Sequence, residues 1–314
     1  MSPAKDLHQA RASASADQAR RGLVPSAWRS LAGRTRDLLQ RHGLRPRKSL
    51  GQNFLLNAAK VERIANAAVE SAAGGPIIEI GAGLGALTVA LATHGNRVVA
   101  FEIDRRLQAP LTELLSPFDN VELRFADFLE ADLEDVAVGR PFVAAGNLPY
   151  QITTPLLEKL FLTPLCRALV VTMQREVAQR LVARPGGKTY GPLTLFCQYY
   201  VERAETVCEL PPGDFLPEPE VSSTALRLVK RPTPPFADPD ASTFQQVVRA
   251  AFNQRRKAVR SALAGSPLLP ADRDGVTHAL LAAGIDGQRR AETLTMDEFA
   301  ALGRELQRLG QTGP

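Results

Sequence analysis

"PIIEIGAGLGALTVALATHG", residues 76–95, decides the fold of this chain. Its first six residues form an apolar run that predicts a buried strand, and its last eleven, closed by Gly95, predict a helix. Gly81, Gly83 and Gly85 lie at the junction, where residues without a Cβ let the backbone approach a ligand closely. The stretch therefore predicts a strand, a glycine-rich turn and a helix, which is one unit of a parallel sheet.

The same alternation continues downstream. Further strands are predicted from "RVVAFEID", "VELRFAD", "PFVAAG" and "ALVVTMQ", and helices from "RRLQAPLTELL", residues 153–162 and "REVAQRLVA". Two more strand-like runs, "ERAETVCEL" and "VSSTALRLVKR", follow a helix after Tyr190. Strands that alternate with helices predict an α/β fold whose parallel sheet carries helices on both faces.

A Pro-rich segment, "RPTPPFADPD", marks a domain boundary. The residues from about 240 to 310 carry only helical patterns. We therefore predict a sheet domain over residues 44–231 and a small all-helical C-terminal domain over residues 232–314.

The N-terminal residues 1–43 predict a basic, disordered arm. Residues 1–48 hold 11 Lys/Arg and 3 Asp/Glu, while the rest of the chain holds 27 Lys/Arg and 30 Asp/Glu, so the net charge of +5 comes wholly from this end. An RNA-contacting tail, a transit peptide and a lineage-specific extension remain alternative interpretations, and Asp6 and Asp17 count against the transit peptide.

Composition excludes several classes of protein. No apolar run approaches the ~20 residues that a membrane span requires, and no secretory hydrophobic region opens the chain. The three cysteines are scattered and odd in number, which indicates reduced core residues in a cytoplasmic protein. The four histidines lie far apart, so no metal site is expected.

Acidic residues follow the next two predicted strands. Glu102 ends the second strand, 21 residues after Gly81, where a carboxylate can accept hydrogen bonds from ribose hydroxyls. Asp127 ends the third strand and could accept from an exocyclic adenine amine. The glycine spacing is G-x-G-x-G, one position short of the dinucleotide fingerprint, so it favours another nucleoside-bearing cofactor over NAD.

A fourth strand ends in "GNLPY", residues 146–150. Two acceptors aimed at an adenine N6 amine would draw its nitrogen towards a tetrahedral, nucleophilic form. The Asn147 side-chain oxygen and the Leu148 carbonyl oxygen can be these acceptors, because Pro149 restricts the residue before it. Tyr150 can stack on the base, so the turn predicts a methyl-transfer site that relies on positioning. A proline turn beside a buried tyrosine remains an equal alternative.

Two other segments suggest substrate contacts. Phe215, in "DFLPEPEVSS", could be a second aromatic plate against the base, although a core phenylalanine fits as well. Arg255, Arg256, Lys257 and Arg260 recur at helical spacing in "AFNQRRKAVRSAL", which indicates either an RNA-phosphate contact or a solvated face.

Together these motifs resemble one family, the bacterial ribosomal RNA small-subunit adenine dimethyltransferases (the kasugamycin-resistance methyltransferases). The resemblance runs from about Leu44 to Leu309 and rests on "GQNFL", "EIGAGLGALT", "FEID", "GNLPY", "FLPEPEVSS", "AFNQRRKAVRSAL" and "RAETLTMDEF". It implies a Rossmann-like class I methyltransferase sheet, the cofactor S-adenosylmethionine, and N6,N6-dimethylation of two adjacent adenines in the 3′-terminal hairpin loop of 16S rRNA. It further implies a monomer that acts on the small ribosomal subunit in the bacterial cytoplasm, or in mitochondria if the arm is a transit peptide.

The resemblance also implies roles for individual residues. The implied cofactor contacts are Asn53, Leu55, Gly81, Glu102, Asp127 and Asn147. The implied base-facing residues are Asn147, Leu148, Pro149, Tyr150 and Phe215. Two features depart from the family pattern: Ala82 stands where proline is common, and the arm before about Arg45 has no counterpart.

Three rival functions remain. A large-subunit rRNA dimethyltransferase shares the chemistry, but "NIPY" or "NIPF" would be expected in place of the turn with Leu148. A ribosome assembly factor, whose binding matters more than its methylation, is the second. A nicotinamide-dependent dehydrogenase is disfavoured by the glycine spacing and by the lack of a histidine suited to hydride transfer.

Overall fold

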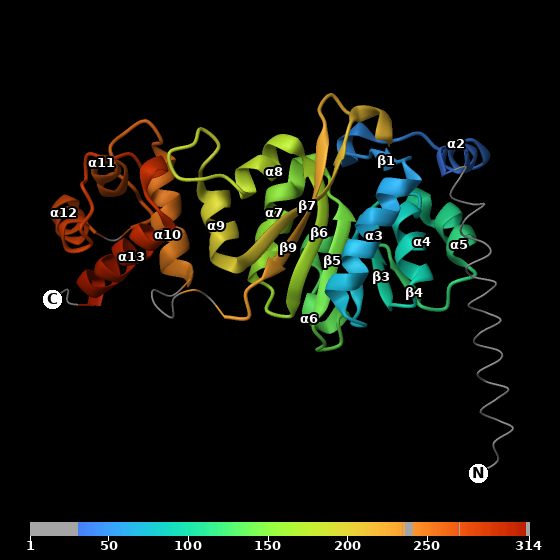
Figure 1. Cartoon of the computed structure of the whole chain (residues 1–314), viewed down its shortest axis with the longest axis horizontal. Coiled ribbons are helices and arrows are strands. Elements are labelled where there is room, and N and C mark those ends of the chain that lie inside the picture. Colours follow the sequence, from blue (N-terminus) through green and yellow to red (C-terminus); the bar gives the residue numbers. More distant parts are fainter. Residues whose placement is uncertain (1–30, 234, 236–240, 270, 312–314) are drawn as a thin grey trace, which may run out of the picture. The chain divides into compact units, whose positions relative to one another are not determined.

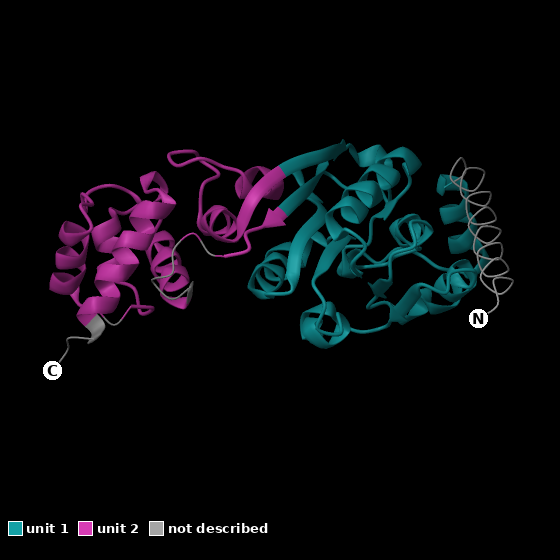
Figure 2. Ribbon diagram, turned by 60° about the horizontal axis from the view of Figure 1, so that its bottom comes forward, with its two compact units in different colours: residues 1–175, 205–228 teal, residues 176–204, 229–314 magenta. Residues whose placement is uncertain are grey.

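The computed structural model describes residues 31–233, 235, 241–269 and 271–311 (Figure 1). The first thirty residues of the predicted arm lie outside this described part. The chain divides into two compact units, one of residues 1–175 and 205–228 and the other of residues 176–204 and 229–314 (Figure 2). Each unit is described by itself below.

A seven-stranded sheet has the order β4-β3-β2-β5-β6-β9-β7 (Figure 1). Its strands are β2 (Ile77–Ile80), β3 (Val98–Phe101), β4 (Val121–Arg124), β5 (Phe142–Asn147), β6 (Cys166–Gln174), β7 (Val201–Leu210) and β9 (Ser223–Lys230). The pairs β2–β3, β3–β4, β2–β5 and β5–β6 are all parallel. The strand order reverses between β2 and β5, and such a switch point opens a crevice at the carboxyl ends of the strands.

Helices cover both faces of this sheet. Every residue of β2 and β3 is buried, as expected for parallel strands that are covered on both sides. The helices of the first unit are α2 (Leu31–Arg41), α3 (Ala58–Ala72), α4 (Ala86–Thr93), α5 (Gln108–Leu115), α6 (Leu133–Val136) and α7 (Thr153–Leu162), with the 3₁₀ helices η1 (Lys48–Leu50), η2 (Arg105–Leu107), η3 (Phe128–Glu130), η4 (Tyr150–Ile152) and η5 (Pro212–Asp214). Helix α3 packs on β5 and β6 and against α4. The predicted fold class is therefore confirmed for the sheet domain.

A two-stranded antiparallel ladder lies beside the sheet, formed by β1 (Phe54–Leu55) and β8 (Phe215–Leu216). Its place is fixed by polar contacts at the start of α3. Asn57 caps α3 by accepting from the Lys60 N–H at 3.2 Å, and its amide donates to Asp214 at 2.8 Å. The Lys60 ammonium also pairs with Asp214, so the chain just before β8 is held against the start of α3.

The described part of the predicted arm differs from the expectation. Residues 31–41 form helix α2, whose buried residues Leu31, Thr35, Leu38 and Leu39 follow the helical spacing i, i+4, i+7 and i+8. Burial of Leu38 and Leu39 stabilises the fold by ~1.5–3 kcal/mol each. The helix therefore forms because it packs on the sheet domain, although an isolated helix of this length would be marginal.

The second unit is mainly helical. It contains most of α8 (Arg175–Leu181), followed by α9 (Pro192–Tyr200), α10 (Ala241–Asn253), α11 (Val259–Ala264), α12 (Arg273–Ala282), the 3₁₀ helix η6 (Ala291–Thr293) and α13 (Met296–Gln311). Residues 176–204 group with the C-terminal helices, whereas the sequence placed the boundary at residue 231. The prediction of helices alone after residue 240 is confirmed in the described residues.

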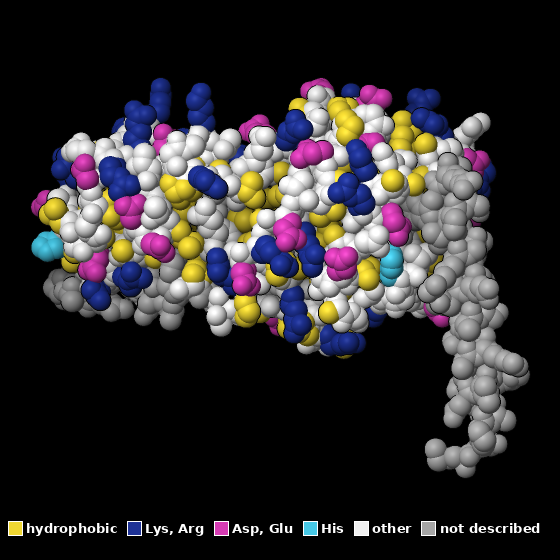
Figure 3. All heavy atoms as spheres, viewed as in Figure 1, with side chains coloured by type: hydrophobic (Ala, Val, Ile, Leu, Met, Phe, Trp, Pro, Cys, Tyr) yellow, Lys and Arg dark blue, Asp and Glu magenta, His cyan; other side chains and the backbone are white. Residues whose placement is uncertain are grey.

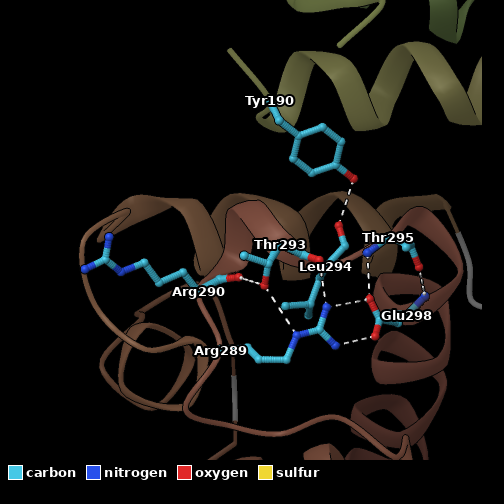
Figure 4. Close-up of polar contacts among 7 residues, drawn as sticks. All are labelled: Tyr190, Arg289, Arg290, Thr293, Leu294, Thr295 and Glu298. Carbon is cyan, nitrogen blue, oxygen red and sulfur yellow. Dashed lines mark hydrogen bonds and ion pairs between the residues drawn. The ribbon is translucent and has the colours of Figure 1, made fainter. Parts of the chain in front are cut away.

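A polar network organises the start of α13 (Figure 4). The Arg289 guanidinium pairs with the Glu298 carboxylate and donates to the Thr293 carbonyl oxygen at 2.7 Å. Glu298 also accepts from the Thr295 N–H at 2.7 Å, which satisfies a backbone donor at the helix terminus. Tyr190, fully buried, donates to the Leu294 carbonyl oxygen at 2.9 Å. The "RAETLTMDEF" segment thus has a structural role within this unit.

Neither a membrane-spanning helix nor a metal-binding cluster occurs in the described residues. None of the helices found there has the length and apolarity that a membrane crossing requires. The same residues hold no group of three or more His, Cys, Asp or Glu side chains that could bind a metal ion.

Candidate functional site

A pocket opens at the carboxyl ends of β2, β3, β4 and β5. This is the crevice that the strand order predicts. Seven of the residues singled out from the sequence line it, namely Asn53, Gly81, Gly83, Glu102, Asp127, Asn147 and Pro149. The sequence therefore identified residues from five separate segments that the fold brings to one cavity.

The glycine turn and Glu102 form one wall of this pocket. Gly81 and Gly83 have φ values of 75° and 59°, in the left-handed region that favours glycine. The Glu102 carboxylate accepts from the Gly83 N–H and from the Asp104 N–H, each at 2.8 Å. Burial raises the pKa of Glu102 above its ordinary value, while these backbone donors oppose the rise. Glu102 thus holds the turn in place as well as facing the pocket.

Asp127 lies across the pocket from the turn, just after β4. It caps η3 by accepting from the Leu129 N–H at 2.8 Å, and its side chain is exposed. Ile103 and Phe128 line the same region, and Ile103 is 52% exposed despite its apolar side chain. Apolar side chains beside a carboxylate suit a flat, partly polar ring such as a nucleobase.

The segment from Leu50 to Phe54 forms another wall of the pocket. The Gln52 amide donates to the Asp104 carboxylate at 2.9 Å and accepts from the Arg47 N–H at 2.8 Å. Asp104 is buried, and its pKa falls to about 2 because the Arg106 guanidinium donates to it at 2.6 and 2.9 Å. The sequence did not predict this connection between Gln52 and Asp104.

Asn147 joins this loop to the turn after β5. Its Nδ2 donates to the Asn53 carbonyl oxygen at 2.8 Å, while its Oδ1 is buried and has no hydrogen-bond partner within the described residues. Buried acceptors without a partner are rare and call for an explanation. Because Asn147 lines the pocket, a bound ligand with an N–H group would supply the missing donor.

A second hollow of about 380 Å³ adjoins the first across the glycine turn. Both cavities are lined by Asn53, Phe54, Gly81, Gly83 and Asn147. The second cavity is also lined by Leu55 and Glu79, and the Glu79 Oε2 atom is buried without a partner in the described residues. Burial raises the pKa of Glu79 to about 8, and the negative charge of Glu102 adds to this rise.

The other predicted base-facing residues line neither cavity. Leu148 is buried, and its N–H donates to the Thr172 carbonyl oxygen at 2.9 Å. Tyr150 is partly buried, its hydroxyl lies 2.8 Å from the Ser223 Oγ, and desolvation raises its pKa. Phe215 is 1% exposed and belongs to the core of the sheet domain. The roles proposed for these three residues therefore stay predictions.

The basic cluster lies in the second unit, where its members differ in environment. Arg255 pairs with Glu292 at 2.8 Å and donates to the Lys188 carbonyl oxygen. Arg256 and Lys257 are exposed, and Arg260 is partly buried. Figure 3 shows Lys and Arg side chains projecting from the upper left of the view.

Comparison with known proteins places this site in context. The profile of the family described as "Ribosomal RNA adenine dimethylase" matches residues 43–308. A protein named "Ribosomal RNA small subunit methyltransferase A" from Geobacillus kaustophilus (strain HTA426) is 46% identical over 281 residues, which cover 87% of this chain and 95% of that protein. The chain is thus similar to this relative over nearly its whole length.

Two solved structures share the fold. A dimethyladenosine transferase from Plasmodium falciparum has a TM-score of 0.69 and 23% identity, covering 82% of this chain and 98% of that one. The 23S rRNA methyltransferase ErmE has a TM-score of 0.61 and 29% identity, covering 81% of this chain and 100% of that one.

These comparisons confirm three predictions made from the sequence. The fold is that of the class I methyltransferases, the enzyme class is an RNA adenine methyltransferase, and S-adenosylmethionine is the cofactor of this class. A ribosomal RNA substrate follows from the family itself. The chain belongs to the ribosomal RNA adenine dimethylase family.

Proposed function

We propose that this chain transfers methyl groups from S-adenosylmethionine to N6 of two adjacent adenines in the 3′-terminal hairpin loop of 16S rRNA. It acts as a monomer on the small ribosomal subunit, in the bacterial cytoplasm. The observation that carries this proposal is the buried, unpartnered Oδ1 of Asn147, a residue that lines both cavities. An adenine amine brings the N–H group that this acceptor lacks.

The two adjoining cavities fit the two ends of the cofactor. Glu102 and Asp127 offer acceptors for ribose hydroxyls and an adenine amine in the larger cavity. In the smaller one, the unpartnered Oε2 of Glu79 suits the ammonium group of an amino acid, because an ammonium supplies three donors and no acceptor. When bound there, S-adenosylmethionine supplies an electrophilic methyl group on a sulfonium.

The residues of the turn act by positioning the adenine amine. Asn147 Oδ1 accepts from one of its protons, and the Leu148 carbonyl oxygen accepts from the other. Pro149 restricts the backbone of Leu148 and so keeps this carbonyl in one direction. Two preorganised acceptors make the nitrogen lone pair available without a strong general base. Tyr150, held by Ser223, provides an aromatic face for the base, whereas Phe215 packs in the core of the sheet domain.

The small-subunit substrate is favoured over the large-subunit alternative. The relative named for the small subunit is 46% identical, whereas the structural neighbour named for 23S rRNA is 29% identical. Leu148 also stands where the large-subunit pattern would have isoleucine. The relative comes from a bacterium, which supports a bacterial cytoplasmic enzyme rather than a mitochondrial one.

Methyl transfer to defined ribosomal particles tests this proposal. Small subunits that lack the modification are incubated with the protein and methyl-labelled cofactor, and the modified nucleotides are mapped. Large subunits and fully modified small subunits are the matched controls. We expect label on two adjacent adenines of 16S rRNA only. Label on 23S rRNA, or none on either particle, would overturn the proposed substrate.

A further inference from the structure

Helix α2 contributes a wall to the smaller cavity. Thr35, in the middle of this helix, lines the cavity together with Glu79, Asn147 and the glycine turn. Thr35 is only 3% exposed, so its side chain lies inside the fold rather than on the surface. A helix that the sequence assigned to a disordered arm therefore reaches the candidate site.

The position of α2 is fixed by contacts on both sides of Thr35. Leu31 on the N-terminal side, and Leu38 and Leu39 on the C-terminal side, belong to the same apolar core as the residues of β2 and α4. At the end of the helix, the Arg41 guanidinium donates to Glu113 of α5 at 2.9 Å, and the His42 ring lies 3.3 Å from the same carboxylate. These contacts hold the face that carries Thr35 against the sheet domain.

The family match begins at residue 43, so α2 lies outside the part of the chain that the family profile covers. The remaining walls of the smaller cavity come from segments within that match. One wall of the smaller cavity is therefore supplied by α2, whereas its other walls come from segments that the family profile covers.

From this juxtaposition we infer that α2 is part of the cofactor site and that Thr35 is a binding residue for the amino-acid end of S-adenosylmethionine. This inference rests on the proposed function, because it assigns the smaller cavity to that end of the cofactor. Thr35 offers a hydroxyl and a methyl group as part of the cavity lining. Both groups suit a short aliphatic chain that ends in charged, hydrogen-bonding atoms.

The test compares two ligands that differ only at this end. S-Adenosylhomocysteine carries the amino-acid part, whereas 5′-deoxy-5′-methylthioadenosine keeps the nucleoside and the sulfur but lacks it. Calorimetric titration of the full-length chain gives the Kd of each ligand for the wild type, Thr35→Phe and Thr35→Ser. Arg36→Phe, on the exposed side of the same helix, is the matched control.

We expect Thr35→Phe to weaken S-adenosylhomocysteine binding ~10-fold or more, because a larger side chain fills the cavity. Binding of methylthioadenosine should change less than ~2-fold. Thr35→Ser, which keeps the hydroxyl, should bind both ligands nearly as the wild type does, and so should Arg36→Phe. Circular dichroism and thermal unfolding of each variant establish that the fold is intact.

Two outcomes overturn the inference while leaving the proposed function in place. In one, Thr35→Phe binds S-adenosylhomocysteine as tightly as the wild type. In the other, it loses affinity for both ligands by the same factor, which would mean that α2 supports the whole pocket rather than one end. A wild-type chain that binds neither ligand would instead overturn the proposed function itself.

Discussion

The side-chain amide of Asn147 donates a hydrogen bond to the backbone carbonyl oxygen of Asn53 at 2.8 Å. A carbonyl oxygen can only accept, so this bond fixes the amide with Nδ2 towards Asn53 and leaves Oδ1 as an acceptor without a partner in the described residues. It also links the loop that lines the pocket to the turn after β5. The two segments lie 94 residues apart in the sequence, and in the proposed function the cofactor and the adenine meet at their junction.

The first prediction concerns catalysis by Asn147. Asn147→Ala removes the Oδ1 acceptor, and turnover should fall ~10²–10³-fold, as is typical for loss of one preorganised polar group. Affinity for the small subunit should change little, because one buried contact is minor beside many phosphate contacts. Labelled methyl transfer and subunit binding are measured on the same preparation.

Asn147→Asp is the informative companion to the alanine variant. It keeps an acceptor but removes the donor to Asn53 and places a negative charge against that carbonyl oxygen. We expect turnover at least as low as that of Asn147→Ala. Near-normal turnover in either variant would remove Asn147 from the catalytic residues. Failure to bind subunits with an intact fold would show that the target loop itself supplies the affinity, and the assembly-factor interpretation would then fail as well.

The second prediction separates two acidic residues of the cofactor pocket. Glu102 accepts from the N–H groups of Gly83 and Asp104, so Glu102→Gln should both weaken cofactor binding ~10-fold or more and lower the melting temperature. Asp127 is exposed and caps only the short helix η3, so Asp127→Asn should weaken binding with a much smaller change in melting temperature. Calorimetry and thermal unfolding of both variants provide the measurement. Unchanged affinity in Glu102→Gln contradicts the ribose assignment.

The third prediction uses the buried carboxyl of Glu79. Its pKa in the folded chain, about 8, lies above the ordinary value of 4.5. The folded state therefore binds more protons than the unfolded state between these two values, and stability falls as the pH rises through this window. The stability that the protonated Glu79 carboxyl contributes is fully present below pH 4.5 and is lost as the pH passes about 8.

Glu79→Gln removes this ionisation, so the loss of stability that it causes at rising pH should disappear. Relative to the wild type, the variant should gain ~1.4 kcal/mol of unfolding free energy per pH unit across the window, as an upper estimate. Urea unfolding at pH 5, 6.5 and 8 measures the difference. A constant difference at all three values would mean that Glu79 titrates normally in the folded chain.

Much of the fold could be predicted because the local pattern and the tertiary structure agree. The apolar runs that form β2, β3 and β5 are buried on both faces of the sheet. Each of these strands ends at, or just before, a residue that lines the pocket. Helix α7 begins and ends at the expected residues, 153 and 162. Once a parallel sheet is inferred, the rule that ligands bind at the carboxyl ends of its strands brings these residues together.

The features that the sequence did not reveal depend on long-range pairing. Helix α2 lies within an Ala- and Arg-rich segment, and composition concealed the helical spacing of Leu31, Thr35 and Leu38. The bond between Gln52 and Asp104 joins residues 52 positions apart, and nothing local to either residue specifies it. Arg255 looked equivalent to its neighbours until the fold brought Glu292 beside it.

That last difference yields the fourth prediction, which divides the basic cluster by environment. Arg256 and Lys257 are exposed, so replacing both with Gln should weaken small-subunit binding and reduce the slope of log affinity against log salt by roughly one unit for each phosphate that is no longer neutralised. Arg255 is held by Glu292 and by the Lys188 carbonyl oxygen, so Arg255→Gln should lower the melting temperature and leave the salt slope nearly unchanged.

Cofactor affinity should be the same in both variants, because the residues that line the cofactor pocket all belong to the sheet domain. Filter binding of small subunits at several salt concentrations, together with thermal unfolding, makes the comparison. An unchanged slope in the double variant would identify the two exposed side chains as a solvated face, and a reduced slope in Arg255→Gln would show that its ion pair with Glu292 opens to bind RNA.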